Sequence, residues 1–283
     1  MAGLDGGTAL AGPRRVPVAT WRRMMRFGGL HGAGQWLVIA AFLLVWELVA
    51  RSGAVSPYLL PPFTAVLERI WSDLLSGDLL LYLALTIYRS LLSFAIAAVA
   101  GVVLALAMTG SRTVRWFFDP VISVAFPMPK IAFLPIVVLW LGFHDLSKVT
   151  MATIDAFFPV VTATLMGIQG VDRYLVWSAR NMGASNRAVF VQILVPAALP
   201  QIITGLQVSL PIALIVTIVA EMLTGGVGLG AAMVNASRYA DSPGVFAGIV
   251  EIGVVGLLLI KAMSMVRRRL LSWHQEEAGV ATV

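Results

Sequence analysis

Long apolar stretches with few charges dominate the sequence. A helix needs about 20 largely apolar residues to cross the hydrocarbon core of a bilayer. This chain has several such stretches, separated by short connections that contain basic residues, proline or glycine. Only 12% of its residues are charged and 59% are hydrophobic, which excludes a soluble domain carrying one membrane anchor. We therefore expect an all-α polytopic membrane protein.

Six membrane spans are expected, with five or seven as alternatives. They cover residues 36–50, 83–109, 116–143, 149–166, 197–223 and 245–265. The third is predicted to be a broken helix, because Pro127, Pro129 and Pro135 interrupt it. Residues 64–75 predict a short amphipathic helix, capped by Thr64, that lies along the membrane surface. In the second span, small residues at every fourth position predict a helix-packing face: Ala97, Gly101 and Ala105.

Basic residues set the predicted orientation. Thirteen of them lie in segments on the side of both termini, against five on the other side, so both termini are expected to be cytoplasmic. We expect a basic cytoplasmic segment at 1–33, a transmembrane domain at 34–273 and a cytoplasmic tail at 274–283. Because the basic residues form short clusters between apolar runs, nucleic acid is not an expected partner, whereas membrane lipid is. The chain has no cysteine and therefore no thiolate metal site or thiol nucleophile.

The main polar insert, at about 171–197, has the pattern of a helical hairpin. Gly183 can take the left-handed conformation that ends a first helix, and Ser185 can cap a second. Pro196 is predicted to end that second helix at the passage into the next span. We expect this hairpin to protrude into the cytoplasm.

The hairpin resembles the cytoplasmic signature of ABC-importer permeases. That signature reads Glu-Ala-Ala, three residues, Gly, nine residues, then Ile-x-Leu-Pro, and its spacing is met by Gly183, Ile193 and Pro196. The chain departs from it at Trp177 and Ser178, and also at residue 195, where valine replaces leucine. Further runs resemble the nitrate, sulfonate, taurine and bicarbonate group of these permeases, at residues 60–62, 129–132, 139–143, 156–159, 220–223 and 228–230.

This resemblance, over about residues 57–273, implies a type I ABC-importer permease fold in a bacterial inner membrane, with a cytoplasmic coupling-helix hairpin. It implies a subunit that moves a small sulfonate, nitrate, carboxylate or similar organic nutrient inward by alternating access. The implied partners are an ATP-binding subunit, in two copies, an extracytoplasmic solute-binding protein and a second copy of this chain. The residues implied in coupling to the ATPase are Ala179, Gly183, Ala184, Ser185, Arg187, Ile193 and Pro196.

ATP and Mg²⁺ are expected on the partner ATPase, with no cofactor bound by this chain. The sequence contains no Gly-Lys dipeptide, so it lacks a phosphate-binding P-loop. No nucleophile with its base and orienting residue is recognisable at a plausible spacing, and neither is a metal cluster. This argues against a membrane enzyme and leaves no candidate catalytic or metal-binding residue. A proton-coupled secondary transporter, with Asp155 and Glu251 as proton carriers, is the alternative function.

Polar and ionisable residues within the spans are candidates for the translocation pathway, because such groups usually face a protein interior or a watery cavity. The candidates are Lys130, Asp155, Pro159, Thr162, Gln207, Thr217, Glu221 and Glu251. The alternative is that these groups pair with one another or cap broken helices, and that Glu221 reaches headgroup water. Arg89 is expected to extend to the interface. If Asp155 and Glu251 line the path, they favour a solute with hydrogen-bond donors or a cationic group.

Overall fold

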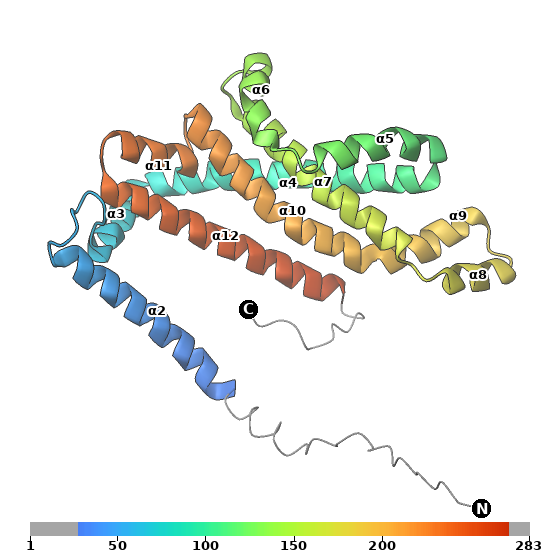
Figure 1. Cartoon of the computed structure of the whole chain (residues 1–283), viewed down its shortest axis with the longest axis horizontal. Coiled ribbons are helices and arrows are strands. Elements are labelled where there is room, and N and C mark those ends of the chain that lie inside the picture. Colours follow the sequence, from blue (N-terminus) through green and yellow to red (C-terminus); the bar gives the residue numbers. More distant parts are fainter. Residues whose placement is uncertain (1–27, 272–283) are drawn as a thin grey trace, which may run out of the picture. The chain divides into compact units, whose positions relative to one another are not determined.

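The computed structural model describes residues 28–271, and every regular element in that range is a helix (Figure 1). The chain divides into two units, residues 1–55 and 56–283. The predicted cytoplasmic segment 1–33 and tail 274–283 lie wholly or mostly outside the described residues.

The first unit contains α2 (Gly28–Arg51), which includes the first predicted span. Its described apolar side chains are largely exposed within the chain; Trp36, for example, is 73% exposed. A contiguous apolar surface of this kind suits lipid or another apolar partner. Near its end, Arg51 Nε lies 2.6 Å from a carboxylate oxygen of Glu47, one helical turn away.

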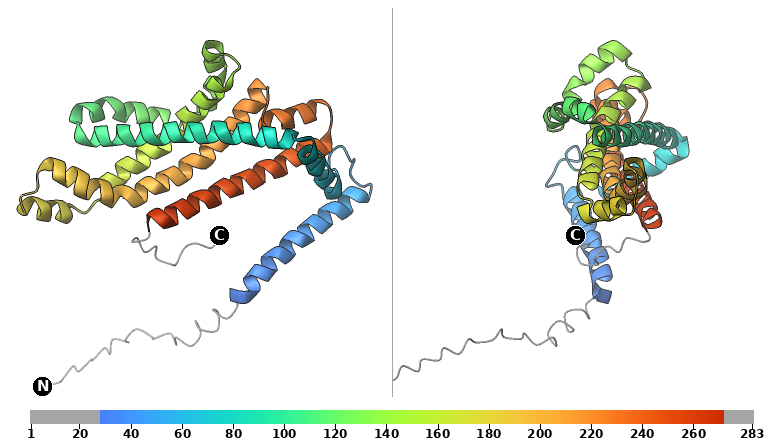
Figure 2. Two further views of the ribbon diagram at one scale, coloured as in Figure 1. Left: turned by 180° about the vertical axis from the view of Figure 1, so that it is seen from behind. Right: turned by 90° about the vertical axis from the view of Figure 1, so that its right-hand side faces the viewer.

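The second unit is built from helices that pack along one another. Its elements are α3 (Phe63–Ser76), α4 (Asp78–Gly110), α5 (Arg112–Ala125), η2 (Lys130–Phe133), α6 (Leu134–Leu141), α7 (Asp145–Gln169), α8 (Arg173–Asn181), α9 (Asn186–Val189), η3 (Phe190–Leu194), α10 (Val195–Thr224), α11 (Leu229–Arg238) and α12 (Ser242–Leu270). The helices α4, α7 and α10 form its centre, each packed against the other two, and α12 lies against α10, α11 and α3 (Figures 1 and 2).

Four helical stretches of the described chain are long and apolar enough to cross a membrane: Asp78–Gly110, Asp145–Gln169, Asn186–Thr224 and Ser242–Leu270. A fifth span is possible if α5 is combined with the residues from η2 to the end of α6, which are bent from it by 93°. The multi-span prediction is confirmed: the described chain has four or five such stretches, where six were predicted with five or seven as alternatives. The remaining predicted span lies in α2.

The break in the third predicted span is confirmed. The helix α5 ends at Ala125, and the chain passes through Pro127 and Pro129 before η2 begins. Proline cannot donate a backbone hydrogen bond and clashes with the preceding turn, which explains a break here. Pro135 lies in the first turn of α6, where a missing N–H is tolerated.

The amphipathic helix α3 differs from its prediction at its first turn. It begins at Phe63, and Thr64 is already helical, so the predicted Thr64 cap is wrong. The extended backbone of Pro62 takes that role instead, and its carbonyl accepts hydrogen bonds from the N–H groups of Ala65 and Val66 at 3.0 and 3.2 Å. Of this helix only Val66 is buried, so most of its apolar face remains uncovered within the chain.

The small-residue stripe of α4 is a packing face, as predicted. Ala97 and Ala105 are fully buried, and a Cβ atom added to Gly101 would lie 2.9 Å from the Val160 side chain and 3.2 Å from the carbonyl oxygen of Phe157. These neighbours belong to α7, so the missing side chain lets the two helix backbones approach closely.

Replacing Gly101 with alanine should therefore destabilise the fold by about 1–3 kcal/mol, because the new methyl group overpacks the α4–α7 contact. The matched control is Gly253→Ala in α12, where an added Cβ meets no atom within 4 Å. Thermal unfolding of the purified proteins in one detergent measures both effects. Equal midpoints for the two variants would contradict the close-packing role of Gly101.

Candidate functional site

The predicted turn of the hairpin is present between α8 and α9. Gly183 has a φ of 86°, in the left-handed region that favours glycine. Its N–H donates to the carbonyl of Arg180 at 2.9 Å, and the N–H of Ala184 donates to the carbonyl of Ala179 at 3.0 Å. This pair of bonds closes the end of α8 as a Schellman motif. Ser185 then caps α9, its hydroxyl accepting from the N–H of Ala188 at 3.2 Å.

Pro196 does not end the second helix, contrary to the sequence prediction. The chain stays helical from Asn186 to Thr224, and Pro196 lies in the first turn of α10. Just before it, residues Phe190–Leu194 form a π-helical turn, in which the N–H of Val195 donates to the carbonyl of Phe190. The wider turn accommodates a residue that has no N–H to donate, so the helix continues through it. Ile193 lies within this turn.

An aromatic cluster on α8 includes Trp177, which occupies the position where the family signature favours glutamate. The rings of Tyr174 and Trp177 meet edge to face with centroids 5.4 Å apart, and the guanidinium of Arg173 lies 5.7 Å from the Trp177 ring. Both rings are at least half exposed, as is Met182 beyond them. Arg187, on α9, is also exposed. The hairpin thus presents a basic and aromatic surface.

Lys130 and Asp155, two candidates for the pathway, pair with each other. Lys130 Nζ lies 3.0 Å from Asp155 Oδ1, and it is 4.9 Å from the centroid of the Phe158 ring. The same ammonium group also donates to backbone carbonyls at the end of α5, among them that of Phe126 at 3.2 Å. Lys130 therefore stabilises the broken helix and neutralises the charge of Asp155. This is the pairing alternative that the sequence left open.

Glu221 lies in a buried polar network, and the expectation that it reaches headgroup water is wrong. Its side chain is fully buried, and one of its oxygens accepts from Arg89 Nη1 at 2.6 Å. It also accepts from the Thr86 hydroxyl at 3.0 Å and from the N–H of Gly230 at 3.1 Å. The expected extension of Arg89 to the interface is likewise wrong, since its side chain is 4% exposed.

Arg89 connects Glu221 to the start of α7 and to the glycine-rich turn. Its Nη2 lies 2.6 Å from Asp145 Oδ1, and its Nη1 donates to the carbonyl of Val227 at 2.6 Å. Lys148, buried on α7, donates to the carbonyl of Gly225 at 2.9 Å. Sequence reasoning missed these partners. The sequence does place an arginine inside the second span. Because a charged side chain there is energetically unfavourable unless it is paired, Arg89 itself indicates a partner in the protein interior.

The remaining pathway candidates lie on α7 and α10, which pack against each other. The hydroxyl of Thr162 donates to the carbonyl of Phe158 in its own helix at 3.0 Å, and Gln207 accepts from Arg267 Nη1 at 2.6 Å. The carbonyl of Pro159 lies against Gly205 of α10, and Thr217 is fully buried. The lining of the translocation pathway stays a prediction.

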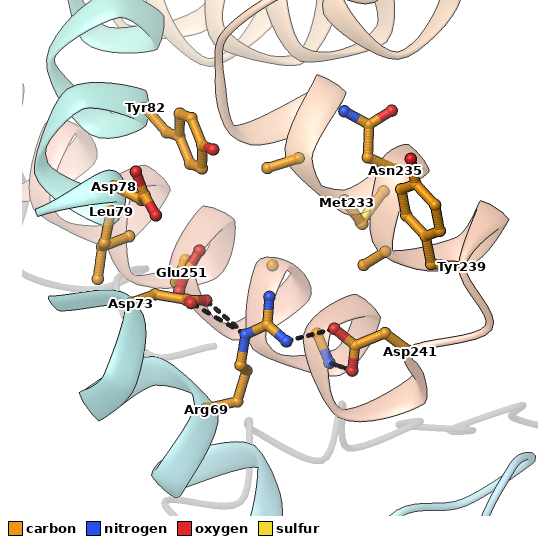
Figure 3. Close-up of a pocket in the computed structure, with 14 residues that line it drawn as sticks. Arg69, Asp73, Asp78, Leu79, Tyr82, Met233, Asn235, Tyr239, Asp241 and Glu251 are labelled. Carbon is orange, nitrogen blue, oxygen red and sulfur yellow. Dashed lines mark hydrogen bonds and ion pairs between the residues drawn. The ribbon is translucent and has the colours of Figure 1, made fainter. Parts of the chain in front are cut away.

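Glu251 lines a polar pocket between α3, α4, α11 and α12, which we call the α12 pocket (Figure 3). Its volume is about 190 Å³. Arg69 Nε donates to both carboxylate oxygens of Asp73 at 2.9 Å, and Arg69 Nη1 pairs with Asp241. Burial opposes the charged form, but these two carboxylates outweigh it and raise the pKa of Arg69. Among residues 28–271, no three His, Cys, Asp or Glu side chains could together hold a metal ion.

Known proteins resemble the chain over most of its length. Residues 97–272 match the family described as "Binding-protein-dependent transport system inner membrane component". The putative aliphatic sulfonates transport permease protein SsuC of Bacillus subtilis (strain 168) is 32% identical, with 90% of this chain and 91% of that protein covered. The taurine transport system permease protein TauC of Escherichia coli (strain K12) is also 32% identical, with 84% and 88% covered.

Solved structures share the fold at lower identity. A bacterial ABC transporter involved in import of the acidic polysaccharide alginate has a chain that matches with a TM-score of 0.60 and 15% identity, covering 89% of this chain and 99% of that one. A chain from an amino acid ABC transporter with histidines matches with a TM-score of 0.59 and 20% identity, covering 69% and 94%. The helical arrangement is therefore that of ABC-importer permeases.

Replacing Arg89 with methionine should destabilise the protein by about 3–5 kcal/mol, because Glu221 would stay buried without its cation. Arg238→Met, at an exposed position, is the matched control and should have little effect. The double variant Arg89→Met with Glu221→Met should recover part of the loss, since both partners are then apolar. Unfolding midpoints in detergent measure all three. A single Arg89 variant as stable as the control would refute the network's structural role.

Proposed function

Since the chain belongs to the family of binding-protein-dependent transport system inner membrane components, the permease subunits of ABC importers, we propose that it moves its solute inward by alternating access driven by a separate ATPase. The hairpin of α8 and α9 is the proposed coupling element. The observation that carries this proposal is the Schellman turn at Gly183, which holds the two short helices together at the spacing of the family signature.

The residues proposed to couple this chain to the ATPase subunit are Ala179, Gly183, Ala184, Ser185, Arg187, Ile193 and Pro196. The first four supply the turn and the cap, while Arg187 is available at the surface. Trp177 and Tyr174 extend this surface with exposed aromatic area, which in protein interfaces often carries much of the binding energy. The ATPase groove that receives the hairpin should therefore be partly apolar, with acidic residues facing the arginines.

The assembly that we propose contains two copies of this chain, two ATP-binding subunits and an extracytoplasmic solute-binding protein. ATP and Mg²⁺ belong to the ATPase subunits, and this chain contributes no catalytic residue. Both termini and the hairpin lie in the cytoplasm of a bacterial cell, as the distribution of basic residues supports. Nucleic acid has no part in this assembly.

A small sulfonate is the proposed solute, because relatives at 32% identity are named for aliphatic sulfonates and taurine. The proton-coupled alternative gains no support from Asp155, whose charge is already balanced by Lys130 at 3.0 Å. Proton-driven uptake in vesicles without ATP would nevertheless favour that alternative.

The coupling role of the hairpin is tested by Gly183→Val. A β-branched residue is strained in the left-handed conformation by roughly 1–2 kcal/mol, so the turn should open and solute-stimulated ATPase activity should fall. Gly77→Val is a matched control: its φ of 85° nearly equals the 86° of Gly183, and neither glycine has an atom within 4 Å of an added Cβ. ATP hydrolysis is measured with and without solute-loaded binding protein.

The expected result is loss of stimulation in the Gly183 variant and retention in the Gly77 variant, with both proteins inserted in the membrane. Equal stimulation in the two variants would count against the hairpin as the coupling element. Co-purification with an ATPase chain tests the broader proposal. A transport-competent protein that needs no such partner would overturn it.

A further inference from the structure

The hairpin of α8 and α9 departs from the Glu-Ala-Ala of the family signature at its exposed positions only. This chain has Trp177, Ser178 and Ala179 in that place. Trp177 is 50% exposed and Ser178 is also exposed, whereas Ala179 is buried. The buried position keeps its alanine and serves the hairpin itself, because the carbonyl of Ala179 accepts the N–H of Ala184 in the Schellman turn. The two changed positions face outward, where a partner binds.

Trp177 lies on the same side of α8 as two arginines. At 100° per residue, Arg173, Trp177 and Arg180 fall within an arc of about 60°. The guanidinium of Arg173 lies 5.7 Å from the Trp177 ring, and the ring of Tyr174 meets it edge to face at 5.4 Å. These contacts restrict the orientation of the indole. We call this surface, made of Arg173, Tyr174, Trp177 and Arg180, the α8 face.

The charge on the hairpin is positive and available to a partner. Segment 171–197 contains three arginines and one aspartate, which gives a net charge of +2. Within the described part of the chain, no carboxylate forms an ion pair with Arg173, Arg180 or Arg187. The aspartate, Asp172, caps α8 by accepting from a backbone N–H at 2.8 Å. A glutamate in place of Trp177 would put a carboxylate between these arginines.

A partner surface that is complementary to a glutamate differs from one that is complementary to the α8 face. A carboxylate in an interface requires a cation or hydrogen-bond donors, whereas an indole flanked by arginines requires an apolar pocket bordered by carboxylates. On the basis of the proposed function, we infer that Trp177 determines which ATP-binding subunit this chain accepts. It docks in such a pocket of its own subunit and disfavours the subunits that serve permeases with the signature glutamate.

The selection follows from the cost of a mismatched contact. Against a groove that is complementary to glutamate, the Trp177 ring leaves a buried cation or donor without its partner, and Arg173 adds like-charge repulsion. A glutamate in the apolar pocket loses its water without gaining a cation. Specificity between related partners commonly combines such unfavourable contacts with favourable ones.

A protein groove fits the α8 face better than a membrane surface does. A helix that lies on a membrane turns its apolar side toward the lipid. On α8 that side holds Leu175, Val176 and Ala179, which follow one another around the helix within about 100°. Trp177 lies about 160° from Leu175, on the side of the arginines. A membrane beneath the apolar side would leave Trp177 facing away from it, open to a protein partner.

Affinity for the ATP-binding subunit tests the inference, with the full-length protein in phosphatidylcholine nanodiscs. The first probe is the subunit that co-purifies with the wild-type chain. The second is the ATP-binding subunit of an importer whose permease has the complete Glu-Ala-Ala signature. We expect the wild-type chain to bind its own subunit at least roughly tenfold more tightly than the second. Equal affinity for the two subunits would overturn the proposal.

Variants at one position should shift this preference. Trp177→Glu restores the signature residue, and should weaken binding of the chain's own subunit roughly tenfold while strengthening binding of the second. Trp177→Phe keeps an aromatic ring and should retain most of the affinity. Leu175→Glu is the matched control, because it adds the same charge at an exposed position on the other side of the same helix. Own-subunit affinity that Trp177→Glu leaves unchanged, or that Leu175→Glu lowers as much, would refute the role of Trp177.

ATP hydrolysis separates partner selection from coupling. At subunit concentrations that saturate the Trp177→Glu variant, its solute-stimulated ATPase activity should recover, whereas that of Gly183→Val should not. Activity that stays low at saturation would overturn the assignment of Trp177 to selection. If the wild-type chain binds its subunit and Trp177→Glu binds it equally well, only the present inference fails. If the wild-type chain binds no ATP-binding subunit, the proposed function fails as well.

Discussion

A single buried guanidinium holds the centre of this protein together. Arg89 on α4 contacts Asp145 at the start of α7, Glu221 near the end of α10, and the carbonyl of Val227 in the turn toward α11. A buried charge is tolerated inside a membrane protein when it is paired, and each of the three guanidinium nitrogens of Arg89 donates to a partner. The close approach of α4 to α7 through Gly101 sets the same helices at the distance that these bonds require.

Most of the charged side chains described within the spans stabilise the fold by pairing with other groups. Lys130 neutralises Asp155 and binds carbonyls of the broken helix, and Lys148 fixes the glycine-rich turn. Glu251 is different, because its enclosed oxygen has no partner in the described part of the chain. Ionisable residues in a membrane protein therefore do not by themselves mark a pathway. Their pairing has to be known before a residue is assigned to transport.

Features that depend only on residues close together in the sequence could be predicted from it. The left-handed Gly183, the Ser185 cap and the break after Ala125 follow from glycine, serine and proline in their own turns. The Arg89–Glu221 pair joins residues 132 positions apart, and no local pattern encodes such a contact. Pro196 illustrates the opposite error: its usual effect predicted a helix end, but the π-helical turn before it preserves the helix.

That continuity makes the helical stretch that contains α10 unusually long. From Asn186 to Thr224 it runs for 39 residues through α9, η3 and α10, which at 1.5 Å per residue is about 58 Å measured along the helix. A bilayer with its headgroups is only about 40–45 Å thick. The stretch bends between α9 and α10, where the π-helical turn lies (Figures 1 and 2). The serine cap of the hairpin and Glu221 of the central network therefore belong to one continuous stretch of helix, with no loop between them.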